Sequence, residues 1–496
     1  MSLLGIDVGT TGCKTTAFSS EGRELATSYR EYNFISEKDG YAELDSFEVW
    51  GKIRETIKEV TTLTREDPVT ALSVSSMGEA MVPVKKDRQI AGNSILGNDL
   101  RGEEFVQTLL KNISPESIYQ INGNIPDVFY SFPKIAWLKK YKPEVYAMTD
   151  YFLLWADFVC YMLGGIPVTS YSLANRTLLF DVHECRWDEK IIQYTGIDIS
   201  KLAPPYQAGS CIGNVSDGIG NELNLNPGVA IISGGHDQCC AALGSGVTGE
   251  SNIATYGMGS FICITPVYSK IPDFKLMYRN KLNFEHHVVP GLFVSFIYNL
   301  SGGALVKWFK NTFADHGSQL SNSVSSGYDI LFDEIPDYLN DIIVIPRFFP
   351  TGPPGFLKKC AGTISGLSYK HSRGDIFLAI LEGITYYFKD FLTDPERDFL
   401  HIDRLVANGG GSKSEKWLQV TADILNKPVI RNKVTEAGTL GAAILAGWGS
   451  NVFPSVSEGV KAMVKKDREF LPVRGNVIHY EKKFEQYKKL YSFLLS

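Results

Sequence analysis

The first residues of the chain, which read "LLGIDVGTTGCKTTAF" from position 3 to 18, constrain its fold more than any other stretch. An apolar strand ends at Asp7, a turn rich in glycine and threonine follows, and a second strand begins at once. The pattern predicts a β-hairpin whose turn presents backbone N–H groups and the hydroxyls of Thr10 and Thr11. Such a turn is suited to hold a phosphate group, although an ordinary tight hairpin would show the same pattern.

A looser copy of this pattern occurs in the middle of the chain. Residues 251–266, "SNIATYGMGSFICITP", read as a strand, a turn containing Gly257, Gly259 and Ser260, and another strand. Glycine-x-glycine turns are common, so this copy alone indicates little. Together the two hairpins predict two halves, residues 1–248 and 249–496, each opening with a turn that faces a phosphate. Helical and strand patterns alternate throughout, which is typical of an α/β fold.

Composition excludes several classes of partner. The 496 residues carry a formal net charge of −6, so no basic surface is expected for a nucleic acid. No apolar run reaches the roughly 20 residues of a membrane span, and no secretion signal is visible, which favours a cytoplasmic protein. The eight cysteines form no CxxC pair, so we interpret them as reduced buried thiols rather than zinc ligands.

A run of three glycines marks a third possible ligand site. In "LVANGGGSKSEKWLQV" an apolar strand precedes the glycines and a capped helix follows them. Gly410 and Gly411 would let a flat ring or a phosphate approach the backbone, and the helix N-terminus after Ser412 favours negative charge. A plain strand-to-helix turn rarely needs three consecutive glycines, which favours a binding role.

The fourth stretch, "ISGGHDQCCAALG", places an isolated aspartate between a buried strand and an apolar helix. Asp237 can point into a cleft from this position, but capping the helix is the commoner role of such an aspartate. His236, taken alone, is interpreted as a structural histidine.

The four stretches together predict phosphoryl transfer to a hydroxyl group. Transfer of a γ-phosphoryl requires positioning, a metal ion and charge neutralisation rather than covalent chemistry by the protein. Asp7 is suited to a hydrated Mg²⁺, which prefers one or two carboxylates together with substrate phosphates. An aspartate such as Asp237, within reach of the acceptor hydroxyl, can take its proton.

From residue 3 to about 450 the chain resembles the FGGY carbohydrate kinases. The first hairpin is similar to their first phosphate-binding hairpin, and "YSFPKIAWLKKYKPEVY" (130–146) resembles their N-terminal signature. "NGGGSKSEKWLQVTADILNKPVI" and "EAGTLGAAILAG" resemble their C-terminal signature. The resemblance implies a two-domain actin/hexokinase-like (ribonuclease H-like) ATPase fold with an interdomain cleft, the cofactors ATP and Mg²⁺, and a homodimer.

The resemblance also implies roles for matched positions. Asp237 would be the general base on the substrate hydroxyl, and Asp7 would help to hold Mg²⁺. The residues assigned to ATP are Thr10, Thr11, Gly12, Lys14, Gly257, Gly259, Ser260, Gly302, Gly410, Gly411 and Ser412. The residues assigned to the sugar are Gly78, Glu79, Asn98, Asp99, Arg101, His236 and Asp237.

Two stretches of the expected sugar site depart from the pattern of xylulose kinases in this family. Their Gln-Met-His motif reads Ser-Met-Gly-Glu at 76–79, and their Trp-Asn-Asp-x-Arg motif reads Gly-Asn-Asp-Leu-Arg at 97–101. The site is therefore expected to lack a stacking ring and a donor, and to gain room and the acceptor Glu79. Glu79 could equally be a surface or ion-paired glutamate. A further departure, the Gly-Pro-Pro-Gly turn at 352–355, is expected to alter the cover of the ATP site.

The predicted function is an ATP-dependent sugar kinase, with a ketopentose such as xylulose as the first candidate. Other sugars or polyols, such as gluconate, glycerol or erythritol, are alternatives. Two non-enzymatic hypotheses remain: a nucleotide-gated scaffold of the actin or Hsp70 type, and a sugar-binding regulator that has lost catalysis.

Overall fold

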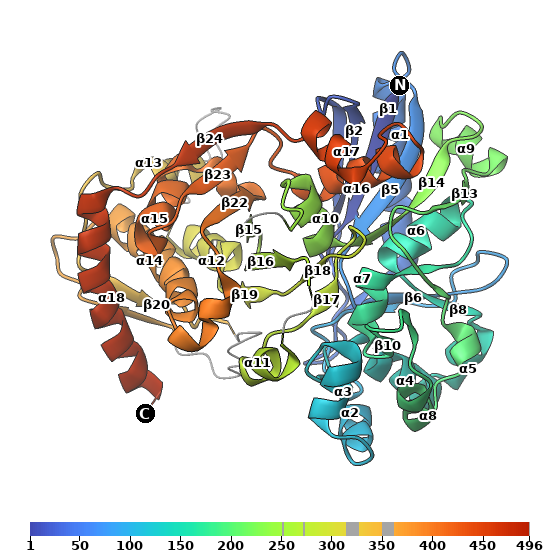
Figure 1. Cartoon of the computed structure of the whole chain (residues 1–496), viewed down its shortest axis with the longest axis horizontal. Helices are drawn as coiled ribbons and strands as arrows, with labels where there is room; N and C mark the ends of the chain where they lie inside the picture. The colour runs from blue at the N-terminus through green and yellow to red at the C-terminus, as the bar shows by residue number, and fades with distance from the viewer. Residues whose placement is uncertain (250–251, 271–272, 314–326, 350–361, 496) are drawn as a thin grey trace.

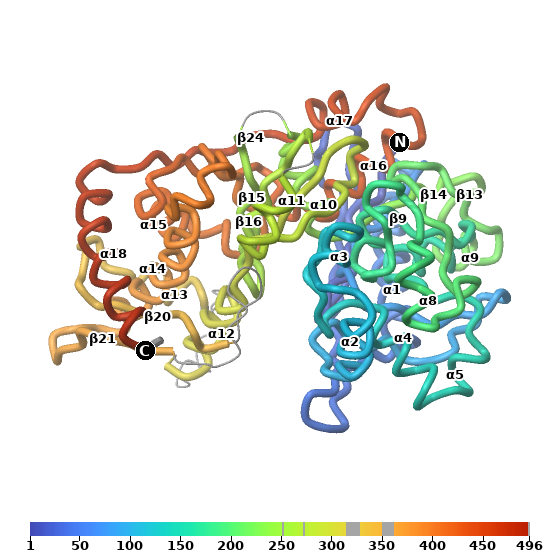
Figure 2. Tube along the Cα trace, turned by 60° about the horizontal axis from the view of Figure 1, so that its bottom comes forward, coloured from blue at the N-terminus to red at the C-terminus, as the bar shows by residue number. Residues whose placement is uncertain are grey.

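The computed structural model describes residues 1–249, 252–270, 273–313, 327–349 and 362–495 (Figure 1). The turn at 352–355 and Cys360 lie outside these residues. The chain forms two α/β bodies side by side, one mainly blue to green and the other mainly yellow to red, while the orange-red segment 437–463 lies with the first of them (Figure 2). In the described part of the chain no helix combines the length and the apolar character needed to cross a membrane.

The first body is built on a six-stranded sheet. The predicted hairpin is confirmed, since the first two strands pair antiparallel and place Asp7 opposite Lys14. In sheet order the strands are β13 (Cys211–Asn214), β14 (Ala230–His236), β5 (Val69–Ser76), β1 (Ser2–Val8), β2 (Gly12–Ser19) and β3 (Glu24–Glu31). The three central strands β14, β5 and β1 are parallel, so their carboxyl ends meet at one edge of the sheet.

The second body repeats this arrangement. Its main strands, in sheet order, are β19 (Ile297–Asn299), β16 (Ile262–Tyr268), β15 (Ile253–Met258), β22 (Arg404–Asn408), β23 (Val429–Asn432) and β24 (Lys466–Phe470). Each pairing has the direction of its counterpart: β15 is antiparallel to β16 and parallel to β22, as β1 is to β2 and β5. The loose similarity between residues 3–18 and 251–266 therefore reflects a structural repeat. Strands β17 (Glu285–His286) and β18 (Phe293–Val294) extend β16 toward the first body.

Helices cover both sheets, and the remaining short strands form small separate sheets. In the first body the helices are α1 (Ser46–Leu63), α2 (Glu103–Leu110), α3 (Pro115–Asn122), α4 (Ser131–Tyr141), α5 (Pro143–Met148), α6 (Trp155–Leu163), α7 (Tyr171–Ala174), α8 (Glu189–Thr195), α9 (Asp217–Leu223) and α10 (Asp237–Gly244). Those that follow are α11 (Phe274–Arg279), α12 (Gly303–Phe313), α13 (Gly327–Asp333), α14 (Arg373–Leu392), α15 (Glu415–Leu425), α16 (Ala437–Gly449), α17 (Val456–Met463) and α18 (Arg474–Leu495). The remaining strands are β4 (Glu43–Leu44), β6 (Met81–Val84), β7 (Ser94–Ile95), β8 (Tyr151–Leu154), β9 (Thr169–Ser170), β10 (Phe180–Asp181), β11 (Arg186–Trp187), β12 (Pro205–Tyr206), β20 (Ile343–Ile345) and β21 (Thr363–Ser365).

Helix α16 crosses from the second half of the sequence to the first sheet, where it lies beside β1 and β5 (Figure 1). Its backbone contacts the sheet so closely that a Cβ at Gly5 would lie 1.9 Å from the Thr439 carbonyl oxygen. It also packs against α10, where a Cβ at Gly441 would lie 1.9 Å from the Cys240 carbonyl oxygen. The small residues of 437–449 thus hold the two halves together at this helix, and the boundary at 248/249 stays a prediction.

The thiols that the structure describes are unpaired, as predicted. Five of them are buried: Cys13, Cys160, Cys239, Cys240 and Cys263. Cys185 is half-buried, and Cys211 is exposed, so the prediction of burial was wrong for Cys211.

The contact between α10 and α16 can be tested with a pair of glycine substitutions. We expect Gly441→Ala to lower the free energy of unfolding by ~2 kcal/mol or more, because its Cβ would overlap backbone that cannot move aside. Gly51→Ala is the matched control: it lies in α1 with no atom within 4 Å of its Cβ position. There alanine should raise the free energy of unfolding by roughly 0.5–1 kcal/mol through helix propensity alone. Urea denaturation measures both, and equal effects would contradict this account of the packing.

Candidate active site

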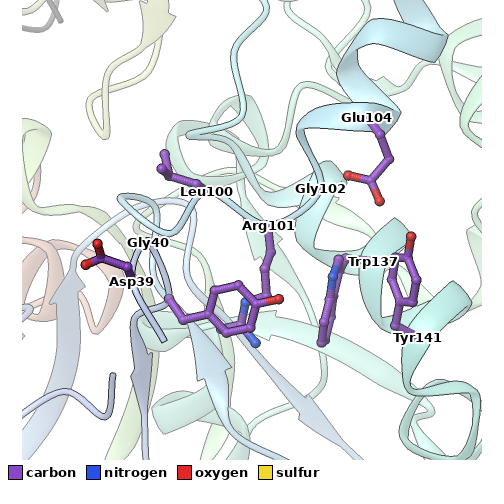
Figure 3. Close-up of a pocket in the computed structure, with 9 residues that line it drawn as sticks. Asp39, Gly40, Leu100, Arg101, Gly102, Glu104, Trp137 and Tyr141 are labelled. Atoms are coloured by element: carbon purple, nitrogen blue, oxygen red, sulfur yellow. The ribbon is translucent and has the colours of Figure 1, made fainter. Parts of the chain in front are cut away.

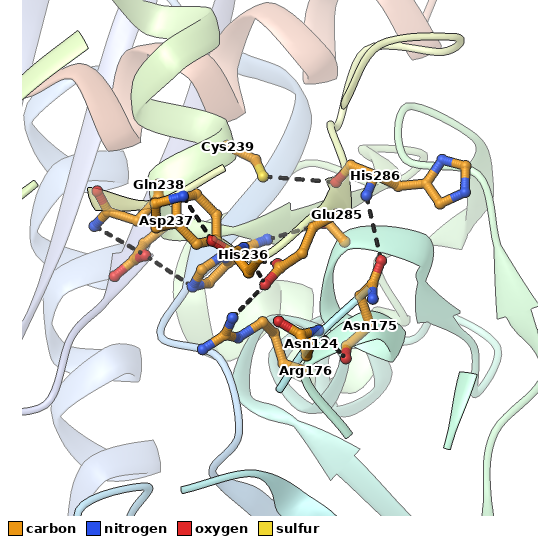
Figure 4. A network of polar contacts seen from close by, with 12 residues as sticks. Asn124, Asn175, Arg176, His236, Asp237, Gln238, Cys239, Glu285 and His286 are labelled. Carbon is orange, nitrogen blue, oxygen red and sulfur yellow. Dashed lines mark hydrogen bonds and ion pairs between the residues drawn. The ribbon is translucent and has the colours of Figure 1, made fainter. Parts of the chain in front are cut away.

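Asp237 lies where β14 ends and α10 begins, as predicted (Figure 4). The capping alternative is wrong: His236 occupies the N-cap position, and no side chain caps the helix. The Asp237 carboxylate instead accepts a hydrogen bond from Gln238 Nε2 (3.2 Å) and lies 3.3 Å from His236 Nε2. Its side chain keeps 28% of its exposure, so it can meet a ligand. A Cβ at Gly234 would lie 1.7 Å from the Val74 carbonyl oxygen, which explains the glycine before this site.

Three carboxylates gather at the carboxyl edge of the first sheet. Asp7 is the second-last residue of β1, Glu79 follows β5, and Asp237 follows β14. These three strands are parallel neighbours in the sheet. The pKa of Asp237 is raised to about 7 by its removal from solvent, with further increases from the charges of Asp7 and Glu79. A carboxylate with a pKa near neutrality is well matched to proton abstraction at physiological pH.

Asp7 combines burial with an oriented carboxylate. Ser75 Oγ donates a 2.6 Å hydrogen bond to Asp7 Oδ1. Burial raises the pKa of Asp7 to about 6; Ser75 and the cation of Lys14 oppose the rise, and the charge of Glu436 adds to it. Lys14 Nζ lies 2.8 Å from Glu436. Such a half-buried carboxylate, close to a second one, favours the binding of a cation.

The donors around Asp7 fit Mg²⁺. Among the described residues no cluster of three or more histidine, cysteine or acidic side chains could hold a metal by itself. Mg²⁺ does not require one, because it retains water and takes only one or two carboxylates with phosphate oxygens. A Cβ at Gly438 would lie 3.2 Å from Asp7 Oδ1, so the first turn of α16 also faces this carboxylate.

The turn of the first hairpin leaves its threonines available. Thr10 and Thr11 are exposed, while the Gly9 N–H closes the turn by donating to the Gly12 carbonyl oxygen (2.9 Å). A Cβ at Gly12 would lie 2.4 Å from the Tyr29 hydroxyl, so glycine is required there by packing. The hydroxyls and N–H groups at the tip face outward, as a phosphate-binding turn requires.

The second hairpin meets both the Asp237 region and the glycine run. Gly259 and Ser260 are exposed at its tip. A Cβ at Gly257 would lie 3.6 Å from Asn408 Oδ1 and 3.7 Å from Gln238 Oε1, so β22 and α10 flank this strand. Gly302 is buried against the hairpin backbone, with a Cβ position 2.7 Å from the Ile262 nitrogen.

The glycine run divides into packed and open positions. Gly409 has a positive φ of 80°, and a Cβ at Gly411 would lie 2.9 Å from both Met258 and Trp417. Ser412 is buried and donates its hydroxyl to the Gly409 carbonyl oxygen (2.6 Å). Gly410 is exposed with no atom within 4 Å of its Cβ position, so it is the glycine that a ligand can approach.

The sugar-site departures have a physical explanation that the sequence did not show. A Cβ at Gly78 would lie 2.9 Å from Arg176 Cγ, so the arginine fills the space and the expectation of added room was wrong at this position. Glu79 is buried, has a positive φ of 58°, and forms an ion pair with Arg176, which is the ion-paired alternative. At Gly97 the Phe129 ring comes within 3.2 Å of the Cβ position.

Asp99 and Arg101 form a bracing cluster with Glu43, and their predicted role in sugar binding stays a prediction. Arg101 donates to both oxygens of Asp99 and to Glu43, and its guanidinium lies between the rings of Tyr41 (4.2 Å) and Trp137 (4.8 Å). Arg101, Tyr41 and Trp137 line a surface hollow of about 340 Å³ whose lining does not include Asp7 or Asp237 (Figure 3). Asn98 is exposed in the same loop.

His236 joins Asp237 to two residues that sequence reasoning missed, Arg176 and Glu285. Arg176 pairs with Glu285 as well as with Glu79. His236 Nδ1 lies 4.0 Å from Glu285 Oε2, and neither atom has a hydrogen-bond partner among the described residues. Burial and the charge of Arg176 hold the pKa of His236 well below its usual value, so the ring is neutral. The interpretation of His236 as a satisfied structural histidine is therefore wrong.

Two repeated sheets with strand-end carboxylates and paired glycine turns are the organisation of the actin/hexokinase-like fold. Family models for the FGGY carbohydrate kinases match residues 2–244 (N-terminal domain) and 274–450 (C-terminal domain). The chain belongs to the FGGY family of carbohydrate kinases and is a sugar kinase.

Individual relatives agree over nearly the whole chain. The xylulose kinase of Bacillus subtilis (strain 168) is 28% identical over 99% of this chain and 96% of its own length. The structure of xylulose kinase from Rhodospirillum rubrum matches with a TM-score of 0.84 at 21% identity, covering 100% of this chain and 99% of that one. Gluconate kinase from Lactobacillus acidophilus matches with a TM-score of 0.83 at 22% identity, covering 99% and 98%. These matches confirm the predicted two-domain α/β fold.

Proposed function

We propose that the protein transfers the γ-phosphoryl group of ATP to a hydroxyl of a sugar, with Asp237 as the general base and a ketopentose such as xylulose as the first candidate substrate. The observation that carries this proposal is the half-exposed Asp237 carboxylate, which has a pKa raised to about 7 and adjoins Asp7 at one sheet edge. The relatives named xylulose kinase support the substrate, while the gluconate kinase keeps other acceptors open.

The nucleotide would lie between the two hairpins. The exposed turns at Thr10, Thr11, Gly259 and Ser260 offer N–H groups and hydroxyls to phosphate oxygens. The open face of Gly410 suits the adenosine. Asp7 would hold Mg²⁺, which when bound neutralises phosphate charge. Gly12, Gly411 and the buried Ser412 hydroxyl shape the turns through packing.

In the transfer step Asp237 orients the acceptor hydroxyl and accepts its proton as the new oxygen–phosphorus bond forms. The neutral His236 ring, 3.3 Å from the carboxylate, limits its rotation. We expect a cytoplasmic enzyme, consistent with its unpaired thiols, and a homodimer as the family resemblance implies.

The role of Asp237 predicts a specific loss in Asp237→Asn. The amide keeps the shape and the contact with Gln238 but cannot accept the proton. We expect kcat to fall ~10²–10⁴-fold, the range for loss of a general base, while ATP binding stays unchanged. Coupled ADP release and calorimetric titration with ATP measure the two. Undiminished turnover in Asp237→Asn would remove Asp237 from the mechanism. If neither the wild-type protein nor the variant transfers phosphate although both bind sugar, the regulator hypothesis would be favoured.

The pH dependence follows from the same carboxylate. Because Asp237 must be deprotonated and its pKa is about 7, kcat/KM should fall as the pH drops below that value. The negative charge of Glu79 raises this pKa, so Glu79→Gln should move the acid limb to lower pH. Glu382→Gln, which breaks the buried pair with Lys483 in the second body, should leave the limb in place. If the fall of kcat/KM at low pH shifts to higher pH in Glu79→Gln, this electrostatic account would be contradicted.

The assignment of Gly410 to the adenosine can be separated from packing. Gly410→Ala should raise the KM for ATP without lowering the free energy of unfolding, because its Cβ would enter open space. Gly411→Ala is the contrast: its Cβ would meet Met258 and Trp417 at 2.9 Å, so it should destabilise the fold. Steady-state kinetics and thermal unfolding distinguish the two, and an unchanged KM for ATP in Gly410→Ala would place the adenosine elsewhere.

A further inference from the structure

Arg176 is the cation of the group of side chains around His236, and Figure 4 shows its contact with Glu285. A second carboxylate, that of Glu79, also pairs with it. Its Nε and Nη2 contact Glu79 Oε1, and its Nη1 donates to Glu285 Oε1. The exposed fractions are 6% for Arg176, 7% for Glu79 and 0% for Glu285, so all three are buried. Each of the three guanidinium nitrogens thus contacts a protein carboxylate.

Aromatic rings complete the surroundings of this guanidinium. The centroids of Tyr130, Phe296 and Phe129 lie 5.1, 5.8 and 5.9 Å from its central carbon. The guanidinium therefore lies among three rings and two carboxylates, and moving it toward a new anion would break its ion pairs with Glu79 and Glu285.

Glu285 comes from the second half of the sequence, but its segment is anchored to the first body. The Tyr119 hydroxyl donates to the Leu282 carbonyl oxygen (2.7 Å), and the Phe284 N–H donates to the Gly123 carbonyl oxygen (2.8 Å). Both bonds lie just before Glu285 in the chain, and just after it the His286 N–H donates to Asn175 Oδ1 (3.3 Å), so the backbone on either side of Glu285 is fixed to the first body. The position of Glu285 beside Arg176 is therefore fixed by the fold, and its side chain is buried there.

The charges of the group do not balance. Acidic side chains outnumber the cation: Glu79 and Glu285 both contact the single guanidinium of Arg176, and Asp7 and Asp237 are two further acidic groups at the same sheet edge. A substrate carboxylate entering here would meet like charges with no unpaired cation among the side chains just described. Like-charge juxtaposition is a strong means of rejecting a ligand. Hydroxyl groups, by contrast, are donors that suit carboxylate oxygens.

We propose that Glu285 is a specificity-determining residue that, with Glu79, saturates Arg176 and restricts the acceptor to uncharged sugars and polyols, so that sugar acids are rejected. The inference rests on the proposed function in that it takes the acceptor site to lie beside Asp237. It narrows the candidates to ketoses and polyols and removes gluconate.

Matched pairs of compounds that differ only in a carboxylate test this proposal: xylitol with xylonate, glucitol with gluconate, and glycerol with glycerate, with D-xylulose as a further neutral acceptor. We expect calorimetric titration of the wild-type protein to show binding of at least one neutral compound, and its acid partner to bind about 100-fold more weakly or not at all. Wild-type binding of an acid as tight as its neutral partner would overturn the proposal, as would no binding of any neutral compound.

Freeing Arg176 should change this preference. In Glu285→Gln the amide keeps the size of the side chain but no longer neutralises the guanidinium, so the ratio of neutral to acid binding should fall about ten-fold or more. Glu79→Gln is a second route to the same result should Glu285→Gln fail to fold, which thermal unfolding would reveal. Glu382→Gln loses a buried ion pair of the same kind with Lys483 and should leave the ratio unchanged. An unchanged ratio in the folded Gln variants would overturn the proposal.

Binding and turnover separate this inference from the proposed function. Neutral-selective binding without phosphoryl transfer to any acceptor would refute the proposed function and leave the specificity of Glu285 standing. Efficient transfer to a sugar acid, abolished in Asp237→Asn, would confirm the kinase and refute the specificity.

Discussion

The site depends on the burial of carboxylates that the first sheet brings to one edge. Asp7, Glu79 and Asp237 follow three adjacent parallel strands, so their separation is set by strand spacing and not by their own preference. Removal from solvent is the main reason that the pKa of Asp7 rises to about 6 and that of Asp237 to about 7. The charges of Asp7 and Glu79 add to the rise at Asp237, and the charge of Glu436 adds to the rise at Asp7. The folded protein stores this unfavourable electrostatics at one edge, where a metal ion and a proton from an alcohol can relieve it.

The cost is sustained by backbone packing that only small residues allow. Gly5 and Gly441 bring α16 into direct contact with β1 and α10, and Gly234 brings β14 against β5. These close backbone contacts fix β1, β14 and α10 relative to one another. Moving Asp7 and Asp237 apart would require separating these elements. The run of small residues at 437–449 therefore supports the site indirectly, because it fixes the positions of β1 and α10, which carry Asp7 and Asp237.

Local patterns were enough to predict the hairpins, the glycine run and the strand-end positions of Asp7 and Asp237, because each is encoded within a few residues. The surroundings of the predicted sugar site were not predictable in this way. Arg176 contacts Glu79 across 97 positions and Glu285 across 109, and nothing near any of these residues signals the other two. For the same reason Asp99 and Arg101, which are close in sequence to each other, proved to form their own bracing cluster with Glu43, Tyr41 and Trp137.

The glycine at position 78 shows how a local departure can have a distant cause. Read alone, glycine in place of histidine indicates an emptier pocket. In the folded chain the space holds the stem of Arg176, and the positive φ at Glu79 turns that carboxylate toward the guanidinium. A larger residue at 78 would displace Arg176 and leave two buried carboxylates without their cation, a costly state. Gly78, Glu79, Arg176 and Glu285 thus form one unit, in which the presence of each residue is explained by its contacts with the others.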